Sequence, residues 1–255
     1  MILKITFLGT GTSQGVPVIA CKCQVCQSSD PLDKRLRSSI LVEANGVTIV
    51  VDTGPDFRQQ MLRENVNILD AVIFTHEHRD HIAGLDDIRA YNFILRNPME
   101  VYAEERVVRA LQYEFPYVFA ERKYPGIPQI NINLINENPF KVNNLPVIPI
   151  RVMHYRLPVL GFRFGDFAYI TDANDISEQE KRKLENLKVF TVCALRRKEH
   201  ISHYTLSEAI ELIKEIKPEI AYLTHISHQM GLHAEVGKEL PENIFLAYDG
   251  LKITV

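Results

Sequence analysis

The stretch that most constrains this chain is Thr75-His76-Glu77-His78-Arg79-Asp80-His81. It follows the apolar run Ala71-Val72-Ile73-Phe74, and the pattern predicts a short buried strand that ends in a ligand-bearing loop. Neutral imidazole and carboxylate are ligands that divalent metals prefer. Three histidines and an aspartate exceed what one tetrahedral ion takes from a single loop. The stretch therefore indicates two adjacent metal ions; the alternative is a polar surface turn with clustered histidines.

Three further candidate ligands each follow an apolar run that predicts a strand. They are His154 after residues 145–152, Asp172 after 167–170 and His225 after 219–223. Taken alone, each would more often be an ordinary turn residue. Strand ends on one edge of a sheet sandwich can converge, so these side chains are candidates to complete the ligand set.

The chain has four cysteines, of which Cys21, Cys23 and Cys26 lie within six residues. In a reducing compartment such a cluster is more often a metal site than a set of disulfides. A tetrahedral structural zinc would need a fourth ligand, and three unligated cysteines are the alternative. Cys193 stands in an apolar run and is predicted to be a buried core thiol.

The segment 9–17, Gly-Thr-Gly-Thr-Ser-Gln-Gly-Val-Pro, is a glycine-rich loop after a predicted strand at 2–8. It lacks the Lys-Ser/Thr ending of a P-loop, so a tight turn near the metal centre is favoured over a phosphate cradle. Residues 39–51 predict a hairpin around Asn45-Gly46. Asp52 follows this hairpin, and it is either a carboxylate that orients a metal-bound histidine or a turn residue.

Helices are predicted over 55–64, 82–95, 104–113 and 234–240, with the helix over 82–95 beginning beside the metals. Two capping boxes predict further helix starts: Ser177 with Glu180, for a helix to Asn186, and Thr205 with Glu208, for a helix to Lys217. The aromatic stretch 113–119 could cap an active site, belong to the core or form a dimer surface.

The chain has 255 residues, of which 46% are apolar, and its formal net charge is −3. That length allows one large domain or two small ones. The charge argues against a global field for nucleic-acid binding. The first residues lack a signal-peptide pattern, and apolar runs stay far below the roughly 20 residues of a membrane span. We expect a soluble cytoplasmic protein that does not act at a membrane.

The ordered motifs at 76–81, 154, 172 and 225 resemble the metallo-β-lactamase superfamily over essentially the whole chain. The resemblance implies a four-layer αββα sandwich, classed as α/β or, in some schemes, α+β. It implies a single domain spanning 1–255, with a zinc-pinned loop at about 9–37.

The resemblance also implies a dinuclear site of two divalent metals, zinc or manganese. Their shared water would have a pKa lowered towards about 7, and the metals would neutralise charge that develops on the substrate. By position, one metal is held by His76, His78 and His154, the other by Asp80, His81 and His225, with Asp172 bridging them.

The glycine-rich loop followed by the three cysteines is similar to one branch, the PhnP-type phosphoribosyl 1,2-cyclic phosphate phosphodiesterases of bacterial phosphonate breakdown. That branch carries a separate structural zinc and a histidine three residues after the last catalytic one. Here this residue is His228, which would complete the site with Cys21, Cys23 and Cys26.

His203 matches a histidine that this branch and tRNase Z place near the leaving group, so we expect it to be a general acid or a phosphate contact. Asp80 is the second expected catalytic residue. Arg196, Arg197 and His200 lie just upstream and either bind phosphate oxygens or form a solvated charged loop. His233 is predicted to be a surface residue.

The sequence therefore predicts a metal-dependent phosphodiesterase for a small, cyclic, ribose-type phosphodiester, with a homodimer suggested by analogy. A tRNase Z-like nuclease is the first rival, but only seventeen residues separate His154 from Asp172, which leaves no room for a tRNA-clamping arm. The metal-bound protein of pyrroloquinoline quinone biosynthesis and a non-catalytic binding module are further rivals. Thioester or lactone hydrolysis is also open, and a β-lactamase is disfavoured without an export signal.

Overall fold

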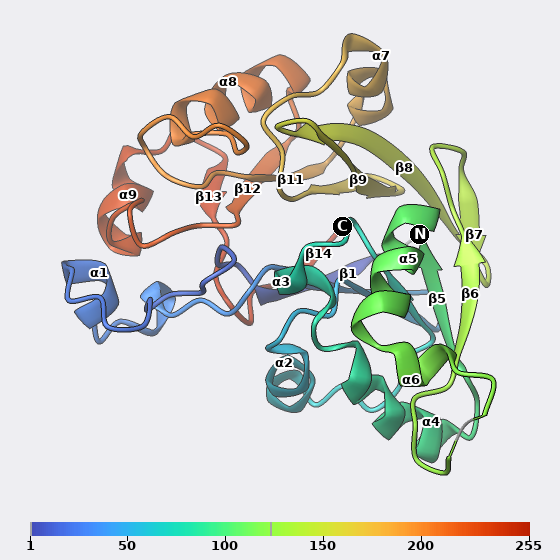
Figure 1. Cartoon of the computed structure of the whole chain (residues 1–255). Helices are drawn as coiled ribbons and strands as arrows, with labels where there is room; N and C mark the ends of the chain where they lie inside the picture. The colour runs from blue at the N-terminus through green and yellow to red at the C-terminus, as the bar shows by residue number, and fades with distance from the viewer. Residues whose placement is uncertain (1, 123) are drawn as a thin grey trace.

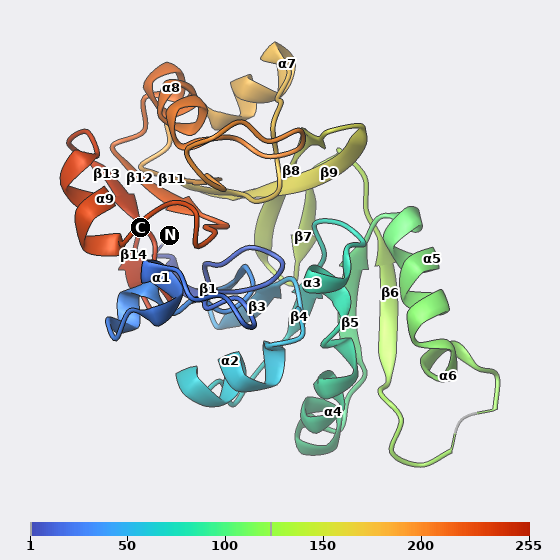
Figure 2. The same cartoon turned by 60° about the vertical axis from the view of Figure 1, so that its left-hand side comes forward.

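Two seven-stranded sheets face each other in the computed structural model, and helices cover both outer faces (Figures 1 and 2). The structure describes residues 2–122 and 124–255, so Met1 and Lys123 lie outside the description. Apart from these two positions, the predicted αββα sandwich is confirmed. Among the described residues, no helix has both the length and the apolar character needed to cross a bilayer.

The first sheet has the strand order β14-β1-β2-β3-β4-β5-β6. Its first four strands pair antiparallel, and β3 to β6 pair parallel. Its strands are β1 (Lys4–Gly9), β2 (Ser39–Ala44), β3 (Val47–Val51), β4 (Ala71–Ile73), β5 (Met99–Ala103), β6 (Ile130–Leu134) and β14 (Lys252–Thr254).

The second sheet has the order β13-β12-β11-β10-β9-β8-β7. Strands β10 to β13 pair parallel, and β7 to β10 pair antiparallel. Its strands are β7 (Phe140–Val142), β8 (Leu145–His154), β9 (Leu157–Phe164), β10 (Phe167–Ile170), β11 (Val189–Cys193), β12 (Ile220–Thr224) and β13 (Ile244–Leu246).

The helices are short and lie mostly on the outer faces of the sheets. The α-helices are α1 (Gln24–Gln27), α2 (Phe57–Glu64), α3 (Arg79–Ile82), α4 (Arg89–Leu95), α5 (Glu105–Glu114), α6 (Pro116–Phe119), α7 (Glu178–Lys181), α8 (Leu206–Ile216) and α9 (His233–Glu239). The 3₁₀ turns are η1 (Pro31–Asp33), η2 (Leu85–Ile88) and η3 (Arg182–Leu184).

The buried apolar side chains form three layers, as a four-layer sandwich requires. The central layer joins the inner faces of both sheets, with Phe7 and Ile49 from one and Phe162 and Tyr169 from the other. A second layer packs α2, α4 and α5 on the first sheet, and a third packs α8 and α9 on the second. The core therefore holds the two sheets in a fixed relation and brings their strand ends to a common edge.

Most of the predicted elements are confirmed, including the hairpin of β2 and β3 and the buried thiol of Cys193. The single helix predicted over 82–95 is wrong, because the segment is divided into the end of α3, then η2 and α4. Gly84 explains the break. Its N–H donates to the Thr53 carbonyl at 2.8 Å, and a Cβ on it would lie 2.2 Å from the Gly54 carbonyl oxygen. This close approach interrupts the helix and anchors the segment to the loop after β3.

The two predicted capping boxes have different outcomes. The box of Thr205 and Glu208 is complete and opens α8. Ser177 accepts from the Glu180 N–H, but the Glu180 carboxylate accepts instead from the Arg151 N–H at 2.6 Å and from Lys183 at 2.8 Å. The helix predicted to reach Asn186 therefore ends at Lys181 and continues only as the 3₁₀ turn η3.

Candidate metal centre

The candidate ligands come together at one edge of the sandwich. His76 and His78 follow β4, His154 ends β8, Asp172 follows β10 and His225 follows β12. Side chains at strand ends on the same edge are close in space even when they are far apart in sequence. The structure therefore brings together, from the ends of four separate strands, the candidate ligands that were predicted from the sequence.

Asp172 lies at the centre of this group and is buried. Its Oδ1 is 2.8 Å from His225 Nδ1 and 3.5 Å from His81 Nε2, and its Oδ2 is 3.7 Å from His76 Nε2. One carboxylate thus faces histidines from both halves of the chain. Three trios of potential ligand atoms, each within 4.8 Å of one another, share this residue: His76, His78 and Asp172; His81, Asp172 and His225; and His154, Asp172 and His203.

The chemistry of these donors fits divalent metals. His76 Nε2 and His81 Nε2 are buried and have no hydrogen-bond partner within the described chain. Buried polar nitrogens of this kind are rare unless something binds them. Asp80 Oδ2 lies 3.2 Å from His81 Nε2, so an oxygen donor stands beside one of these nitrogens. Cations coordinated here would satisfy these nitrogens.

The other sides of these imidazole rings are held by the protein. His81 Nδ1 lies 2.7 Å from Asp52 Oδ2, and Asp52 also accepts from the N–H and hydroxyl of Thr75, both at 2.8 Å. A ring that donates from Nδ1 to a carboxylate leaves Nε2 free for a metal. Of the two interpretations of Asp52, the structure supports the residue that orients a histidine. His154 is held in the same way, since its Nδ1 is 2.8 Å from the Ser202 carbonyl oxygen.

Burial and charge act in opposite directions on the histidines of this cluster. Burial and the neighbouring His81 keep the pKa of His76 well below its usual value, which leaves its ring neutral. Burial also opposes charge on His81, but Asp80, Asp172 and Asp52 outweigh it and raise the pKa of His81 well above the usual value. The buried carboxylates therefore demand positive charge at this point, which a divalent cation would supply.

His203 also lies in the cluster. Its ring centroid is 4.5 Å from that of His154 and 4.8 Å from that of His225, with which it stacks. Burial, followed by the charge of His225, lowers the pKa of His203 to about 2, and its Nδ1 has no partner among the described residues. At the start of α8, the N–H groups of Thr205 and Glu208 are occupied by the helix's own capping box, whereas His203 Nδ1 has no such partner among the described residues.

The cysteine cluster is assembled with the fourth residue that the sequence suggested. His228 Nδ1 lies 3.3 Å from Cys21 Sγ, 3.3 Å from Cys23 Sγ and 3.5 Å from Cys26 Sγ. The N–H of Cys26 is the main cause that lowers the pKa of Cys23 to about 6, whereas burial raises that of Cys26 to about 11. At least one thiolate is thus available near neutral pH for a metal.

Several residues that position the site carry no sequence signal that could have identified them. Ser38 Oγ lies 3.2 Å from His225 Nδ1 and donates to the Gly11 carbonyl, which brings the glycine-rich loop beside the site as expected. Buried Arg35 donates to Thr10 Oγ1 at 2.7 Å, and its Nη2 is 3.0 Å from His233 Nδ1. His233 is partly exposed, and its contact with Arg35 gives it a structural partner that the sequence did not predict.

Two arginines that were candidates for phosphate binding are engaged elsewhere. Arg196 donates to the carbonyls of Lys198 and Glu199 and to Gln229, and Arg197 donates to the Met230 carbonyl and pairs with Glu239. These contacts shape the loop before α8 and favour the interpretation as a charged surface loop over phosphate binding. His200 packs near His203, with ring centroids 5.1 Å apart.

The aromatic stretch 113–119 is divided between core and surface. Phe115 and Val118 are buried with the helices of the first sheet, and Tyr117 donates to Asp86 Oδ1. Tyr113 is 84% exposed. Two of these side chains therefore belong to the core, which favours that interpretation over an active-site cap.

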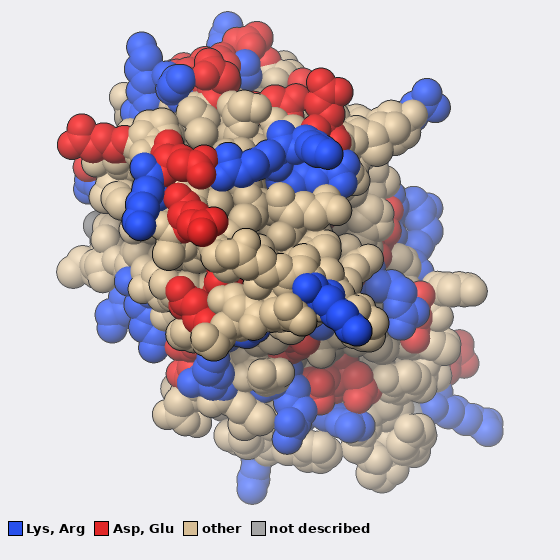
Figure 3. Space-filling view, turned by 90° about the vertical axis from the view of Figure 1, so that its left-hand side faces the viewer, with Lys and Arg blue, Asp and Glu red and all other residues tan. Residues whose placement is uncertain are grey.

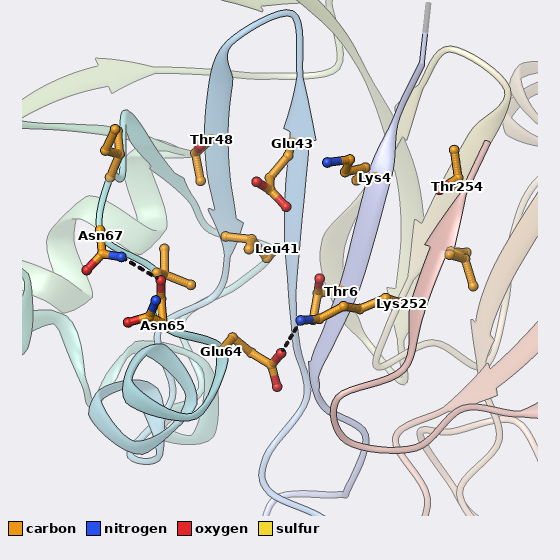
Figure 4. Close-up of a pocket in the computed structure, with 13 residues that line it drawn as sticks. Lys4, Thr6, Leu41, Glu43, Thr48, Glu64, Asn65, Asn67, Lys252 and Thr254 are labelled. Atoms are coloured by element: carbon orange, nitrogen blue, oxygen red, sulfur yellow. Dashed lines mark hydrogen bonds and ion pairs between the residues drawn. The ribbon is translucent and has the colours of Figure 1, made fainter.

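A cavity of about 440 Å³ opens beside the cluster. It is lined by His78, His154, Tyr155, Arg156, Leu157, Ile201 and Ser202. A separate cavity of about 570 Å³ lies over β14, β1, β2 and β3 (Figure 4). It contains none of the candidate ligands, and an ion pair of Glu64 with Lys252 crosses it at 3.1 Å.

Charges are mixed on the face of the molecule that Figure 3 presents. Lysines and arginines are interspersed there with aspartates and glutamates. This face therefore offers no uniform cationic surface of the kind that phosphate-backbone binding favours.

Comparisons with known proteins agree with this geometry. A family model described as a beta-lactamase superfamily domain matches residues 47–226. A solved structure described as a new diphosphatase from the PhnP family is 39% identical and superposes with a TM-score of 0.94, covering 100% of this chain and 98% of that one. The zinc-bound PqqB structure from Methylobacterium extorquens, 17% identical, covers 98% of this chain and 99% of its own with a TM-score of 0.76, and so shares the fold.

A curated relative from Porphyromonas gingivalis, named octanoyltransferase, is 41% identical over 256 residues. The match covers 99% of this chain but 52% of that protein. This chain thus spans about half the length of that relative.

Proposed function

The chain belongs to the metallo-β-lactamase superfamily, in a PhnP-like group, and from this we propose that it is a phosphodiesterase for a small, cyclic, ribose-type phosphodiester. Hydrolase chemistry and divalent-metal binding accompany that membership; the substrate class and the dinuclear site are the proposal. The observation that supports it most is the position of Asp172, whose two oxygens face ligand sets from both halves of the chain. A carboxylate shared in this way is typical of a site for two metals.

In this proposal the first metal is held by His76, His78 and His154, the second by Asp80, His81 and His225, and Asp172 is common to both. When bound, two divalent ions lower the pKa of a water molecule and neutralise charge that develops on the substrate's oxygens. Asp52 fixes the His81 ring, and the Ser202 carbonyl fixes His154, so the ligand nitrogens are oriented before a metal arrives.

The chain's own contribution to phosphate chemistry would come from Asp80 and His203. Asp80 has a carboxylate oxygen 3.2 Å from His81 Nε2, where it could orient the attacking water. The neutral ring of His203 can donate a hydrogen bond to a phosphate or leaving-group oxygen, while burial disfavours a permanent charge on it. A structural zinc on Cys21, Cys23, Cys26 and His228 would pin the loop at about 9–37.

A second candidate activity is hydrolysis of a phosphoric anhydride. The relative described as a diphosphatase is 39% identical over nearly its whole length, which favours this alternative substrate for the same site. The name octanoyltransferase has less weight, because about half of the protein that carries it lies outside the match.

The test is phosphorus NMR of a five-membered cyclic ribose phosphate incubated with zinc- or manganese-loaded protein. Wild-type protein should open the ring, and Asp80→Ala should not, because it removes an oxygen donor from the cluster. A nucleoside diphosphate in a parallel tube tests the anhydride alternative. If neither metal supports ring opening, the cyclic phosphodiester proposal is wrong, and cleavage of the diphosphate alone would replace it with the second candidate.

A further inference from the structure

The turn between β8 and β9 lines the cavity beside the metal cluster and has an unusual backbone. Tyr155 and Arg156 are its two residues, since His154 pairs with Leu157 across the hairpin. Tyr155 has φ of 58°, and it is 47% exposed. Positive φ at the first position of a two-residue hairpin turn is where glycine is favoured. A bulky aromatic residue there is a genuine outlier.

The other positive-φ positions of the described chain follow the usual preferences more closely. Five of these eleven other non-glycine residues are asparagine, and Asp52, Asp172 and His225 belong to the candidate metal cluster or support it. A strained residue persists when its surroundings hold it in place, and such residues concentrate at functional sites. Tyr155 is the one Phe or Tyr residue among all twelve, and its turn conformation does not itself call for an aromatic ring.

The surroundings that hold Tyr155 also join two walls of the cavity. The Tyr155 N–H donates to Asn174 Oδ1 at 2.6 Å, and Asn174 Nδ2 donates to the Ile201 carbonyl at 3.3 Å. Asn174 thereby ties the hairpin turn to the loop before α8. Ile201 is 64% exposed and lines the same cavity. An aromatic ring and an aliphatic side chain thus border one cavity next to His78 and His154.

Arg156 adds a second flat group. Its guanidinium carbon lies 5.1 Å from the centroid of the Tyr155 ring. Among residues 2–122 and 124–255, no carboxylate forms an ion pair with Arg156, whereas Arg79, Arg106 and Arg197 all have acidic partners. Arg156 is therefore a cation at the mouth of the site that the rest of the chain does not neutralise.

We propose that Tyr155 and Arg156 form a stacking platform for a planar ring, and that the substrate is a nucleoside-type phosphodiester that carries its base. This deepens the proposed function and rests on it. Aromatic rings and guanidinium planes are the groups on which proteins stack unpaired bases. The scissile phosphate would lie over the metal cluster while the base enters the cavity between the hairpin turn and Ile201.

The test compares a nucleoside 2′,3′-cyclic phosphate with the cyclic phosphate of methyl riboside, which has the same reactive ring and no base. Metal-loaded wild-type protein should have a kcat/KM about 5- to 100-fold higher for the nucleoside substrate, the range expected from stacking one base. Tyr155→Asn removes the ring but keeps a residue that tolerates positive φ, and it should bring this ratio close to one. Tyr155→Phe should preserve the ratio.

Two further measurements keep the outcomes distinct. Tyr113→Ala deletes an exposed tyrosine outside the cavity and should leave the ratio unchanged. Calorimetry with adenosine 3′-monophosphate and ribose 5-phosphate reports binding without turnover, and only the former should weaken in Tyr155→Asn. Hydrolysis of both substrates with equal efficiency, and equal calorimetric affinities, would overturn the platform while the proposed function stands. If the protein hydrolysed neither of the two cyclic phosphates, the proposed function would be wrong. The calorimetry alone would then test the platform.

Discussion

At the scale of single residues, Asp52 shows how a buried charge is used. It is fully enclosed, with φ of 66°, and its oxygens accept from Thr75 and face His81 Nδ1. Burial raises its pKa, although His81 acts against this. Leaving such a charge buried is costly unless it is paired. The contacts of Asp52 with Thr75 and His81 therefore both stabilise the fold and orient the ring of His81, a candidate metal ligand.

Asp52→Asn should weaken metal binding by about 10- to 100-fold, because an amide can donate to His81 Nδ1 and favour the wrong tautomer. Titration of metal-free protein with zinc or manganese measures this. Asp70→Asn is a matched control, since Asp70 accepts from the Thr48 N–H away from the cluster. Equal metal affinities for wild type and Asp52→Asn would contradict the orienting role.

The candidate ligands could be identified from sequence because each stands where an apolar run stops. Among the residues that hold them, Asp52 was suggested by its position after a predicted strand, but Ser38 and Ser202 could not be identified. Ser38 meets His225 across 187 positions, and the carbonyl that holds His154 belongs to Ser202, whose side chain has no part in it. Backbone acceptors and contacts between distant segments leave no periodicity or spacing in a sequence.

At the scale of elements, the loop that carries Asp80 packs directly against the backbone at Gly54, with no space for a side chain between them. A Cβ on Gly54 would lie 2.2 Å from the Asp80 carbonyl oxygen, and Gly84 has the same relation to Gly54. The loop after β3 and the ligand loop are therefore packed backbone to backbone. This packing, rather than helix propensity, sets the course of residues 82–95.

Gly54→Ala should lower the free energy of unfolding by about 1–3 kcal/mol, as overpacking does, and should also reduce metal affinity by displacing Asp80. Gly237→Ala is the matched control. Gly237 lies in α9, and a Cβ there would meet nothing within 4 Å, so the change should raise stability by up to about 1 kcal/mol. Chemical denaturation measures both. A Gly54→Ala protein as stable as wild type would show that the loop can shift without cost.

Element prediction from sequence succeeded where local chemistry decides and failed where tertiary contacts do. The capping box at Thr205 is formed entirely within α8 and was identified correctly. The box at Ser177 is incomplete because the backbone N–H of Arg151, in strand β8, donates to the Glu180 carboxylate. Arg151 is distant from Glu180 in the sequence, so local sequence patterns could not predict this hydrogen bond.

At the scale of the whole molecule, the two candidate metal sites join distant parts of the chain. His228 meets Cys21 across 207 positions, and the Asp172 cluster joins residues 76–81 to residue 225. Metals that bind only the folded state stabilise it by mass action. We therefore expect the melting temperature to depend on metal content at both sites.

Elemental analysis of purified protein should give about three metal ions per chain, two in the Asp172 cluster and one on the cysteines. Cys26→Ser should lose about one, and its melting temperature should fall, because a thiolate ligand to structural zinc is removed. Asp172→Asn should lose metal from the other site and keep the cysteine-bound ion. Unchanged zinc in Cys26→Ser would argue against the structural site.

The pairing of β1 with β14 has a consequence for how the protein is made. During translation, the segment with the three cysteines leaves the ribosome long before His228, and β1 long before β14. A nascent chain that has not reached residue 225 therefore lacks the last histidine of the candidate hydrolytic centre and His228, the fourth candidate ligand of the cysteine cluster. A chain that stops before residue 225 would therefore hold neither candidate ligand set in full, so metal binding at both sites would depend on the completed fold.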